Sequence, residues 1–217
     1  QISQAVPEDI RRPISLPPAT AAAQAATAGA RVLAYTYNEP TVFYEYMYDT
    51  AQAGHARGIK SVMVSSGYMA RAPMLRLAPH LDAIKIDLKG FSESFYRQYC
   101  GGSLEPVKET IKRVHALGKW LEIVCLIVPT INDDQEQIRQ MCQWLLRAVG
   151  PLVPVHFTRF MPAYKLTHLP PTPVATLEAC RQTALSVGLK YVYVGNAPGS
   201  AGENTYCASC GRVVVRR

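Results

Sequence analysis

Two residues of opposite charge, Asp87 and Lys89, stand at the end of a short apolar run, Ala83 to Leu88. Alternate residues of a β-strand share one face, so we expect the two side chains to point the same way. A charge in an apolar environment costs several kcal/mol of free energy unless it meets a partner or a ligand. Both residues are therefore candidates for binding, while an ion pair of Lys89 with Asp87 or Glu39 is the structural alternative.

Polar segments also follow other apolar runs. They are Thr36 to Thr41 (T-Y-N-E-P-T), Ser65 to Tyr68 (S-S-G-Y), Pro129 to Asp133 (P-T-I-N-D) and Thr158 to Tyr164 (T-R-F-M-P-A-Y). Taken singly, each segment could be a turn or the start of a helix. Taken together they suggest one ligand site, because ligands bind at the carboxyl ends of the strands in barrels and in doubly wound sheets.

Glu122 poses a similar question, since it shares a face with Trp120 and Val124 of an expected strand. A charge at this position also needs a partner or a ligand. His156 is the only one of the five histidines that falls in an expected strand. We interpret it as a hydrogen-bonded wall residue rather than a metal ligand.

The elements that position these residues alternate between strand and helix. The expected strands are apolar on both faces, which is typical of parallel strands covered by helices, and this alternation favours either a doubly wound sheet or a barrel. No strand precedes the first helix, so we expect the sequence to open within a βα unit. We expect strands at residues 31–37, 60–65, 83–88, 120–128, 153–160 and 189–194, and helices at 13–28, 41–57, 71–77, 92–99, 105–117, 134–148 and 172–187.

The overall composition suits a globular protein. Apolar residues make up 48% of the sequence, and no run approaches the roughly 18 apolar residues of a membrane span. The net charge is +7, but the basic residues are dispersed, whereas nucleic-acid binders concentrate them on one face. Glycine-rich phosphate loops, G-x-S-x-G and H-E-x-x-H are absent. With no recognisable signal peptide, we expect a cytoplasmic protein that binds neither nucleic acid nor membrane.

The six cysteines divide into two groups. Cys100, Cys125, Cys142 and Cys180 stand alone, and we expect them to be buried as small apolar residues. Cys207 and Cys210 form C-x-x-C followed by Gly211, the spacing of half a zinc knuckle, although a closed zinc site needs four ligands. We expect this pair to be exposed, mobile and poor in metal; a zinc or auxiliary-cluster site and a loose surface pair stay open as interpretations.

Five segments resemble, in this order, the radical S-adenosylmethionine (SAM) superfamily. They are Tyr35 to Thr41, Asp82 to Gly90, Ile127 to Asp133, Gly195 to Gly199 and Gly202 to Cys207. The branch they resemble is the AmmeMemoRadiSam-system enzyme, which is similar to pyruvate formate-lyase activating enzyme. The resemblance covers residues 1–217.

This resemblance implies a partial, TIM-like (β/α) barrel whose first strand is missing. Residues 1–194 would form the barrel, and residues 195–217 a cysteine-containing tail. In the family, a [4Fe–4S] cluster held by C-x-x-x-C-x-x-C cleaves SAM reductively to a 5′-deoxyadenosyl radical, which abstracts hydrogen from a substrate. The substrate here would be a protein, and the electron donor a flavodoxin or ferredoxin.

The resemblance also implies roles for individual residues. Glu39, with backbone near Asn38, would accept from the methionine ammonium of SAM. Asp87, Leu88 and Lys89 match the family's Asp-Leu-Lys, in which the lysine reaches the methionine carboxylate. Ser66 would contact the ribose, and Tyr164 would line the adenosyl pocket.

One departure from the family pattern concerns the cluster. The sequence contains no C-x-x-x-C-x-x-C, and Gln1 to Gln4 resembles the stretch that normally follows its last cysteine. We therefore expect the parent protein to be an enzyme and this chain alone to be inactive. Two other functions stay open: a cofactor-free barrel lyase with Lys89 or Lys85 as Schiff-base amine, and a non-catalytic binding module.

Overall fold

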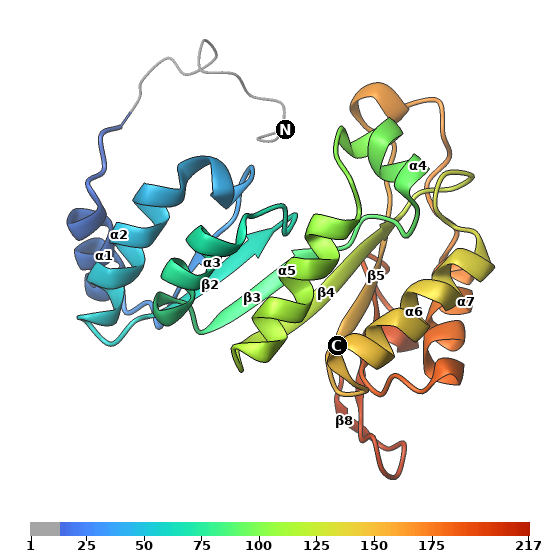
Figure 1. Cartoon of the computed structure of the whole chain (residues 1–217). Helices are drawn as coiled ribbons and strands as arrows, with labels where there is room; N and C mark the ends of the chain where they lie inside the picture. Colours follow the sequence, from blue (N-terminus) through green and yellow to red (C-terminus); the bar gives the residue numbers. More distant parts are fainter. Residues whose placement is uncertain (1–13) are drawn as a thin grey trace.

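Short runs rich in valine, isoleucine and tyrosine form a parallel sheet in which neighbours in sequence are also neighbours in space. A computed structural model describes residues 14–217, and Figure 1 shows the arrangement of its elements. The sheet has the strand order β1-β2-β3-β4-β5-β6, and every pair is parallel. Its strands are β1 (Val32–Tyr35), β2 (Lys60–Ser65), β3 (Ala83–Asp87), β4 (Trp120–Ile127), β5 (Val155–Arg159) and β6 (Val192–Gly195).

Helices connect consecutive strands, as right-handed βαβ units require. The α-helices are α1 (Pro18–Thr27), α2 (Tyr44–His55), α3 (Arg71–Leu77), α4 (Glu93–Phe95), α5 (Glu105–Ala116), α6 (Gln135–Val149) and α7 (Val174–Val187). Short 3-10 turns are η3 (Pro40–Phe43), η4 (Ala78–His80), η6 (Tyr164–Leu166) and η7 (Ala201–Glu203), and η5 (Tyr96–Cys100) is a π-helical turn. Asp134 caps α6 by accepting from the Gln137 N–H at 2.8 Å.

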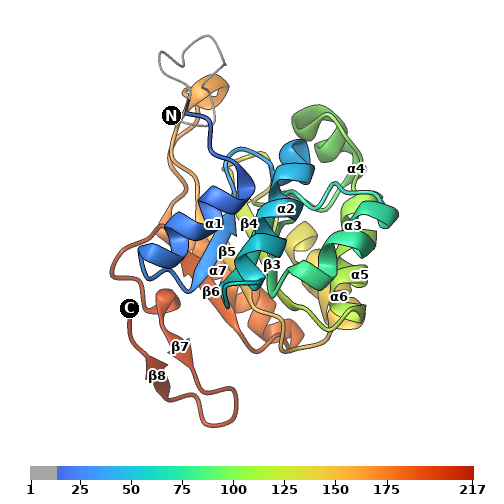
Figure 2. The same cartoon turned by 90° about the vertical axis from the view of Figure 1, so that its left-hand side faces the viewer.

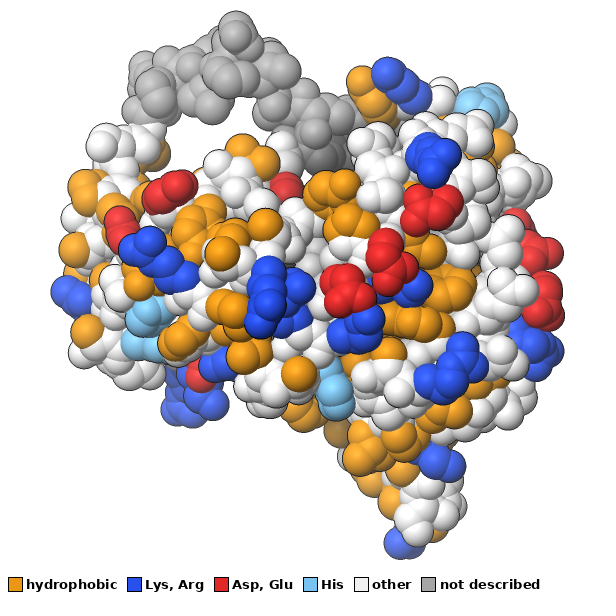
Figure 3. All heavy atoms as spheres, in the orientation of Figure 1, with side chains coloured by type: hydrophobic (Ala, Val, Ile, Leu, Met, Phe, Trp, Pro, Cys, Tyr) orange, Lys and Arg blue, Asp and Glu red, His pale blue; other side chains and the backbone are white. Residues whose placement is uncertain are grey.

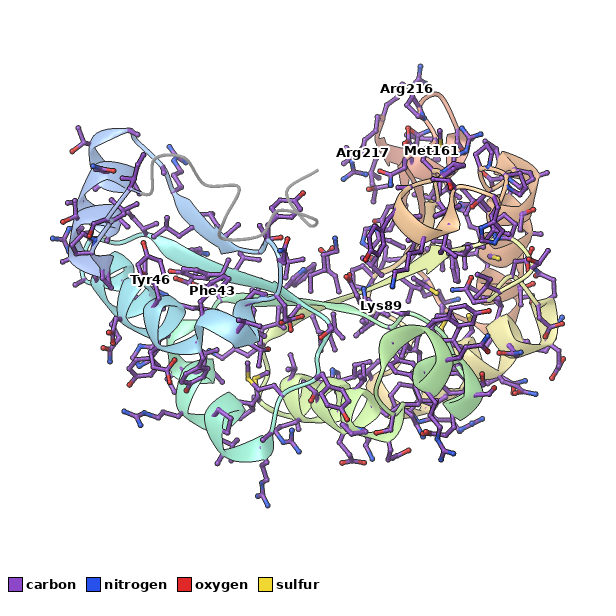
Figure 4. The ribbon with its side chains drawn as sticks, turned by 90° about the horizontal axis from the view of Figure 1, so that it is seen from above. Phe43, Tyr46, Lys89, Met161, Arg216 and Arg217 are labelled. Atoms are coloured by element: carbon purple, nitrogen blue, oxygen red, sulfur yellow. The ribbon has the colours of Figure 1, made fainter. Side chains whose placement is uncertain are left out.

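Helices cover only one face of the sheet. Along β2 and β3, buried residues alternate with partly exposed ones, and Figure 4 shows the sheet as an arc with helices on its outer side. Among residues 14–217 the strands form an open sheet with β1 and β6 at its edges. The prediction of a partial barrel is therefore confirmed. Helices do not cover both faces of the strands, as their apolar residues had suggested, and the concave face keeps apolar residues such as Val62 and Val64 partly exposed.

The core lies between the outer face of the sheet and the helices. Met63, Ile84, Ile123 and Phe157 are completely buried there and belong to one continuous cluster. Gly90 lies directly above a core ring, since a Cβ at this position would stand 2.5 Å from Cδ1 of Phe95. The turn after β3 can therefore approach the core closely only because residue 90 has no side chain.

Several element boundaries differ from the sequence prediction. The helix expected at 41–57 divides into η3 and α2, and the helix expected at 92–99 divides into α4 and η5. The start of the expected helix at 13–28 includes Pro13, which lies outside the described residues, as does the stretch Gln1 to Gln4. Alternation of apolar residues does not distinguish an α-helix from the tighter or wider turns that join it.

The tail contains a hairpin that the sequence did not predict. Strands β7 (Thr205–Tyr206) and β8 (Val213–Val215) pair in antiparallel fashion as a separate two-stranded sheet. Figures 1 and 2 show this hairpin projecting from the body of the molecule. The C-x-x-C pair lies in its connecting loop.

The surface carries charges of both signs. Figure 3 shows lysine and arginine side chains scattered among acidic ones over the helical face, with hydrophobic side chains gathered on the projecting hairpin. Within residues 14–217, no helix combines the length and apolar character needed to cross a membrane.

Candidate functional site

Glu39 joins the carboxyl ends of β1 and β2. Its Oε1 accepts hydrogen bonds from the Thr41 N–H at 3.2 Å, the Thr41 hydroxyl at 2.9 Å and the Ser65 hydroxyl at 2.6 Å. Its Oε2 accepts from the Ser66 N–H at 2.7 Å. A carboxylate has about four acceptor sites, two on each oxygen. These contacts, with a further hydrogen bond from the Ser66 side chain, already use this capacity.

These contacts decide the ionisation of Glu39. Burial raises the pKa of the Glu39 carboxyl, but the hydrogen bonds from Ser65, Ser66 and Thr41 stabilise the carboxylate and together hold its pKa below the ordinary value. The group is therefore ionised at neutral pH and available to a cation. Neutralising Glu39 would weaken the hydrogen bonds that link the ends of β1 and β2, and would also remove a charge.

The lowered pKa of Glu39 predicts a pH-dependent contribution to stability. Because the folded state favours the carboxylate, the contribution is complete above the ordinary pKa of about 4.3 and is lost as pH falls through the lower folded pKa. Glu39→Gln, which places an amide donor against the Ser66 N–H, should cost about 1–3 kcal/mol at pH 7. Urea unfolding at several pH values measures this difference, and it should shrink below pH 4.

Glu45→Gln is the matched control, because Glu45 is exposed on the first turn of α2. It should change the free energy of unfolding by less than about 0.5 kcal/mol. If the free energies of unfolding of wild type and Glu39→Gln differed by the same amount at pH 7 and pH 3, the stabilising role of the ionised Glu39 carboxylate would be contradicted.

Asp87 and Lys89 project from the end of β3 and form an ion pair. Lys89 Nζ lies 3.2 Å from Asp87 Oδ2, with both side chains partly exposed. The Lys89 N–H donates to the Tyr96 hydroxyl at 3.3 Å. Figure 4 shows Lys89 near the middle of the arc, with Phe43 and Tyr46 toward one end and Met161 toward the other.

Ser66, Asp87 and Lys89 line one pocket of about 420 Å³. These three residues, which were predicted from their positions at strand ends, therefore lie together. Glu39 is hydrogen-bonded to Ser66 beside them. Tyr68, from the strand-end segment Ser65 to Tyr68, also lines this pocket. Sequence reasoning missed the rest of the lining, which is Tyr96, Tyr99, Cys100, Gly101, Gly102 and Val107.

Cys100 corrects one expectation. It is exposed at the pocket wall rather than buried as a small apolar residue, because the π-helical turn η5 ends there and Gly101 takes a positive φ of 65°. Cys125, Cys142 and Cys180 are buried, as expected. Burial raises the pKa of the Cys142 thiol to about 12, so this thiol stays protonated.

Four predicted site residues are not part of the pocket lining: Glu39, which contacts it through Ser66, and Leu88, Asn38 and Tyr164. Leu88 is completely buried, so its side chain belongs to the core and only its backbone remains for a ligand. Asn38 is exposed in the turn after β1. Tyr164 begins η6 after β5 and is 67% exposed.

Asn132 is a buried side chain that links two strand ends by hydrogen bonds, a role that the sequence did not reveal. Its Oδ1 accepts from the Val128 N–H at 2.7 Å, while its Nδ2 donates to the carbonyls of Lys89 at 2.7 Å and Leu126 at 2.8 Å. Asn132 does not begin the next helix, since Asp134 caps α6. The amide instead ties the end of β3, and with it Lys89, to the end of β4.

Thr172 links the ends of the next pair of strands, β4 and β5, in a similar way. Its hydroxyl donates to the Ile127 carbonyl at 2.6 Å and accepts from the Phe160 N–H at 3.1 Å. It was expected to begin a helix, but α7 begins at Val174. Neighbouring strand ends are thus joined by Glu39, Asn132 and Thr172.

Glu122 and His156 satisfy one another on the concave face. Glu122 Oε2 lies 3.0 Å from His156 Nε2, and the Trp120 indole N–H donates to Glu122 Oε1 at 2.9 Å. The hydrogen bond with His156 is the largest influence and lowers the pKa of Glu122. The interpretation of His156 as a hydrogen-bonded wall residue agrees with this geometry.

The tail cysteines lie away from these strand ends. Cys207 is half-buried and Cys210 is exposed. Hydrogen bonds from Arg212, first from its backbone N–H, lower the pKa of the Cys210 thiol. Among residues 14–217, His, Cys, Asp and Glu side chains nowhere gather in groups of three or more that could hold a metal ion.

Comparisons with known proteins agree with this architecture. Residues 4–142 match the family model described as Radical SAM superfamily. An uncharacterized protein of Methanocaldococcus jannaschii is 46% identical over 185 residues, which are 85% of this chain and 55% of that protein. The chain thus spans little more than half the length of this relative.

Solved structures show the same fold. A domain of pyruvate-formate lyase-activating enzyme from Bacteroides vulgatus has a TM-score of 0.64 at 17% identity, over 75% of this chain and 98% of that one. Streptococcus suis SuiB bound to S-adenosylmethionine has a TM-score of 0.67 at 13% identity, over 86% of this chain and 45% of that one. The family match covers more than half of the sequence and the open parallel sheet is shared with an activating enzyme, so the chain belongs to the radical SAM superfamily.

Proposed function

We propose that this chain holds SAM at the carboxyl edge of its sheet, as the barrel of a radical enzyme. Membership of the superfamily supports reductive cleavage of SAM as the general chemistry. One observation carries the proposal for this chain. Ser66, Asp87 and Lys89 line a single pocket of about 420 Å³, and Glu39 is hydrogen-bonded to its rim at Ser66.

The charges of these residues suit the methionine end of SAM, which carries an ammonium and a carboxylate. Lys89 would donate to the carboxylate, while the ionised Glu39 carboxylate would receive the ammonium, with the backbone near Asn38 beside it. Asp87 would hold the Lys89 ammonium in place until the ligand arrives. Charge-assisted hydrogen bonds of this kind orient a ligand as well as hold it.

The remaining assignments concern the nucleoside. Ser66 would contact the ribose through its hydroxyl. Leu88 would contribute backbone only, because its side chain is in the core. Tyr164 would line the adenosyl pocket, and its exposure leaves it free to close over a bound ligand.

The residues described do not fit an iron–sulfur cluster. Such clusters are held by several closely placed thiolates, whereas burial raises the pKa of Cys125, Cys142 and Cys180 in the core and keeps them protonated. Within residues 14–217, no group of three or more side chains could hold a metal ion. The cluster, with its C-x-x-x-C-x-x-C, is therefore assigned to the parent protein. This chain would supply binding and orientation, and alone would be inactive.

The parent protein would be an AmmeMemoRadiSam-system enzyme acting in the cytoplasm. The likeness to an activating enzyme supports a protein as the substrate, and such chemistry needs an electron donor such as flavodoxin or ferredoxin. The concave face of the open sheet offers access for a polypeptide, because helices cover only the outer face.

Isothermal titration of this chain with SAM tests the proposal. We expect one binding site with a dissociation constant of about 0.1–1 mM, since the contacts to Glu39 and Lys89 do not require iron. The proposal would be overturned if SAM, added to a concentration about five times the upper expected dissociation constant of about 1 mM, released no heat of binding. Irreversible capture of a carbonyl compound on Lys89 or Lys85 by borohydride would instead support a Schiff-base lyase.

A further inference from the structure

The hairpin formed by β7 and β8 holds its two cysteines in a closed loop. The Cys207 N–H donates to the Arg212 carbonyl at 2.8 Å, and the Gly211 N–H donates to the Cys207 carbonyl at 2.9 Å. Gly211 takes a φ of 71°, in the left-handed region that favours glycine. These contacts bring the chain back on itself directly after Cys210.

This geometry places both sulfurs in one small loop at the surface. Cys207 is half-buried and Cys210 exposed, while Cys125, Cys142 and Cys180 are buried in the core. Thiolates separated by two residues and followed by a tight turn can reach the same tetrahedral metal ion. The tail thus carries accessible thiols, and the turn that holds them is already formed.

Contacts within the tail close the base of the hairpin, and Tyr193 joins it to β6. The Arg217 N–H donates to Asn204 Oδ1 at 2.8 Å, and its guanidinium donates to the Glu203 carbonyl at 3.1 Å and the Thr205 hydroxyl at 2.8 Å. Tyr193 of β6 lies 3.3 Å from the Thr205 hydroxyl through its own hydroxyl. A loop closed by its own hydrogen bonds at the end of such a hairpin loses less conformational freedom when it binds a ligand.

We propose that Cys207 and Cys210 form a two-thiolate zinc site. No residue of this site lines the pocket proposed for SAM, so the inference goes beyond the radical chemistry and does not depend on it. Two ligands are half of a closed zinc site, and among residues 14–217 the remaining two are not supplied. Water, a second copy of this chain or another thiolate segment would complete the coordination.

Cobalt(II) titration of this chain under anaerobic conditions tests the proposal, because thiolate-bound cobalt absorbs strongly in the near ultraviolet. We expect this band to appear and to be abolished by zinc, which binds thiolates more tightly. One cobalt per monomer would mean that solvent completes the site. One cobalt per two chains, with a matching dimer mass, would mean that two hairpins share the ion; both results support the site.

Cysteine variants identify the ligands. Cys207→Ser and Cys210→Ser should each remove the band, whereas Cys100→Ser, the matched control at the other exposed cysteine, should leave it unchanged. Unaltered thermal unfolding would show that the variants fold. A missing band at tenfold excess cobalt, or a band that survives both substitutions, would overturn the proposal, as would a [4Fe–4S] signal that requires Cys207.

Gly211→Ala tests the turn without removing a sulfur. An alanine at a left-handed φ costs about 1–2 kcal/mol. Metal binding would have to supply this free energy to form the turn, so cobalt affinity should fall about 5- to 30-fold. Gly29→Ala is the control, because Gly29 also has a φ of 71° and open space around it. Equal cobalt affinities in the two variants would show that the turn does not prepare the site.

Discussion

Asn132→Leu should lower the free energy of unfolding by about 3–5 kcal/mol. The substitution removes an amide that satisfies three buried backbone groups, one each from Val128, Leu126 and Lys89. A buried donor or acceptor left without a partner costs about 1–3 kcal/mol. Leucine has the same number and branching of side-chain heavy atoms as asparagine, so the substitution creates no cavity. Urea denaturation with an unchanged m-value measures the loss.

The same substitution should also disturb ligand binding, because Asn132 holds the backbone carbonyl of Lys89. Gln140→Leu is the matched control: Gln140 is exposed on α6 and bonds only to Glu136, so its loss should cost less than about 0.5 kcal/mol. If Asn132→Leu unfolded within 1 kcal/mol of wild type, the bracket between β3 and β4 would not be needed for the fold.

Lys89→Met should weaken SAM binding by about 10-fold or more. Methionine keeps the length of the aliphatic stem but removes the ammonium proposed to meet the ligand carboxylate, and a hydrogen bond to a charged group contributes about 1.5–3 kcal/mol. Because Lys89 is partly exposed, solvent screening places the expected effect at the lower end of that range. Isothermal titration against wild type gives the ratio.

Lys85→Met provides the comparison on the same strand. Lys85 lies four residues earlier on β3, opposite Glu122 in the register of β4, and does not line the pocket. Its substitution should leave SAM affinity within about twofold of wild type. Equal losses in both variants would indicate a general effect of positive charge rather than a contact made by Lys89, and would remove the assignment.

The local pattern of apolar residues was sufficient to predict the bounds of those strands and helices that do not depend on distant contacts. The strand at 60–65 and the helix at 71–77 have the bounds that alternation and helical spacing predicted. The strand-end positions of Ser66, Asp87 and Lys89 also followed, since parallel strands bring their carboxyl ends to one edge. The presence of a partial barrel depended on the family resemblance, because alternation alone also allowed a doubly wound sheet.

What the sequence did not reveal depends on contacts between distant residues. Asn132 and Lys89 are 43 positions apart, and nothing in P-T-I-N-D distinguishes a buried bracket from a cap. The wall formed by Tyr99 and Cys100 depends on a π-helical turn, whose apolar spacing resembles that of an ordinary helix. The hairpin of the tail was missed because β7 and β8 are shorter than the runs that alternation can identify.

The agreement between strand order and chain order has a consequence for biosynthesis. Each strand from β2 to β6 pairs with the strand made immediately before it, so each of these five strands finds a partner that the ribosome has already produced. A nascent chain can add one βα unit at a time, and each unit buries its helix against a sheet that already exists. The Asn132 bracket forms in the same order, because Lys89 and Leu126 have both been synthesised by the time the asparagine arrives.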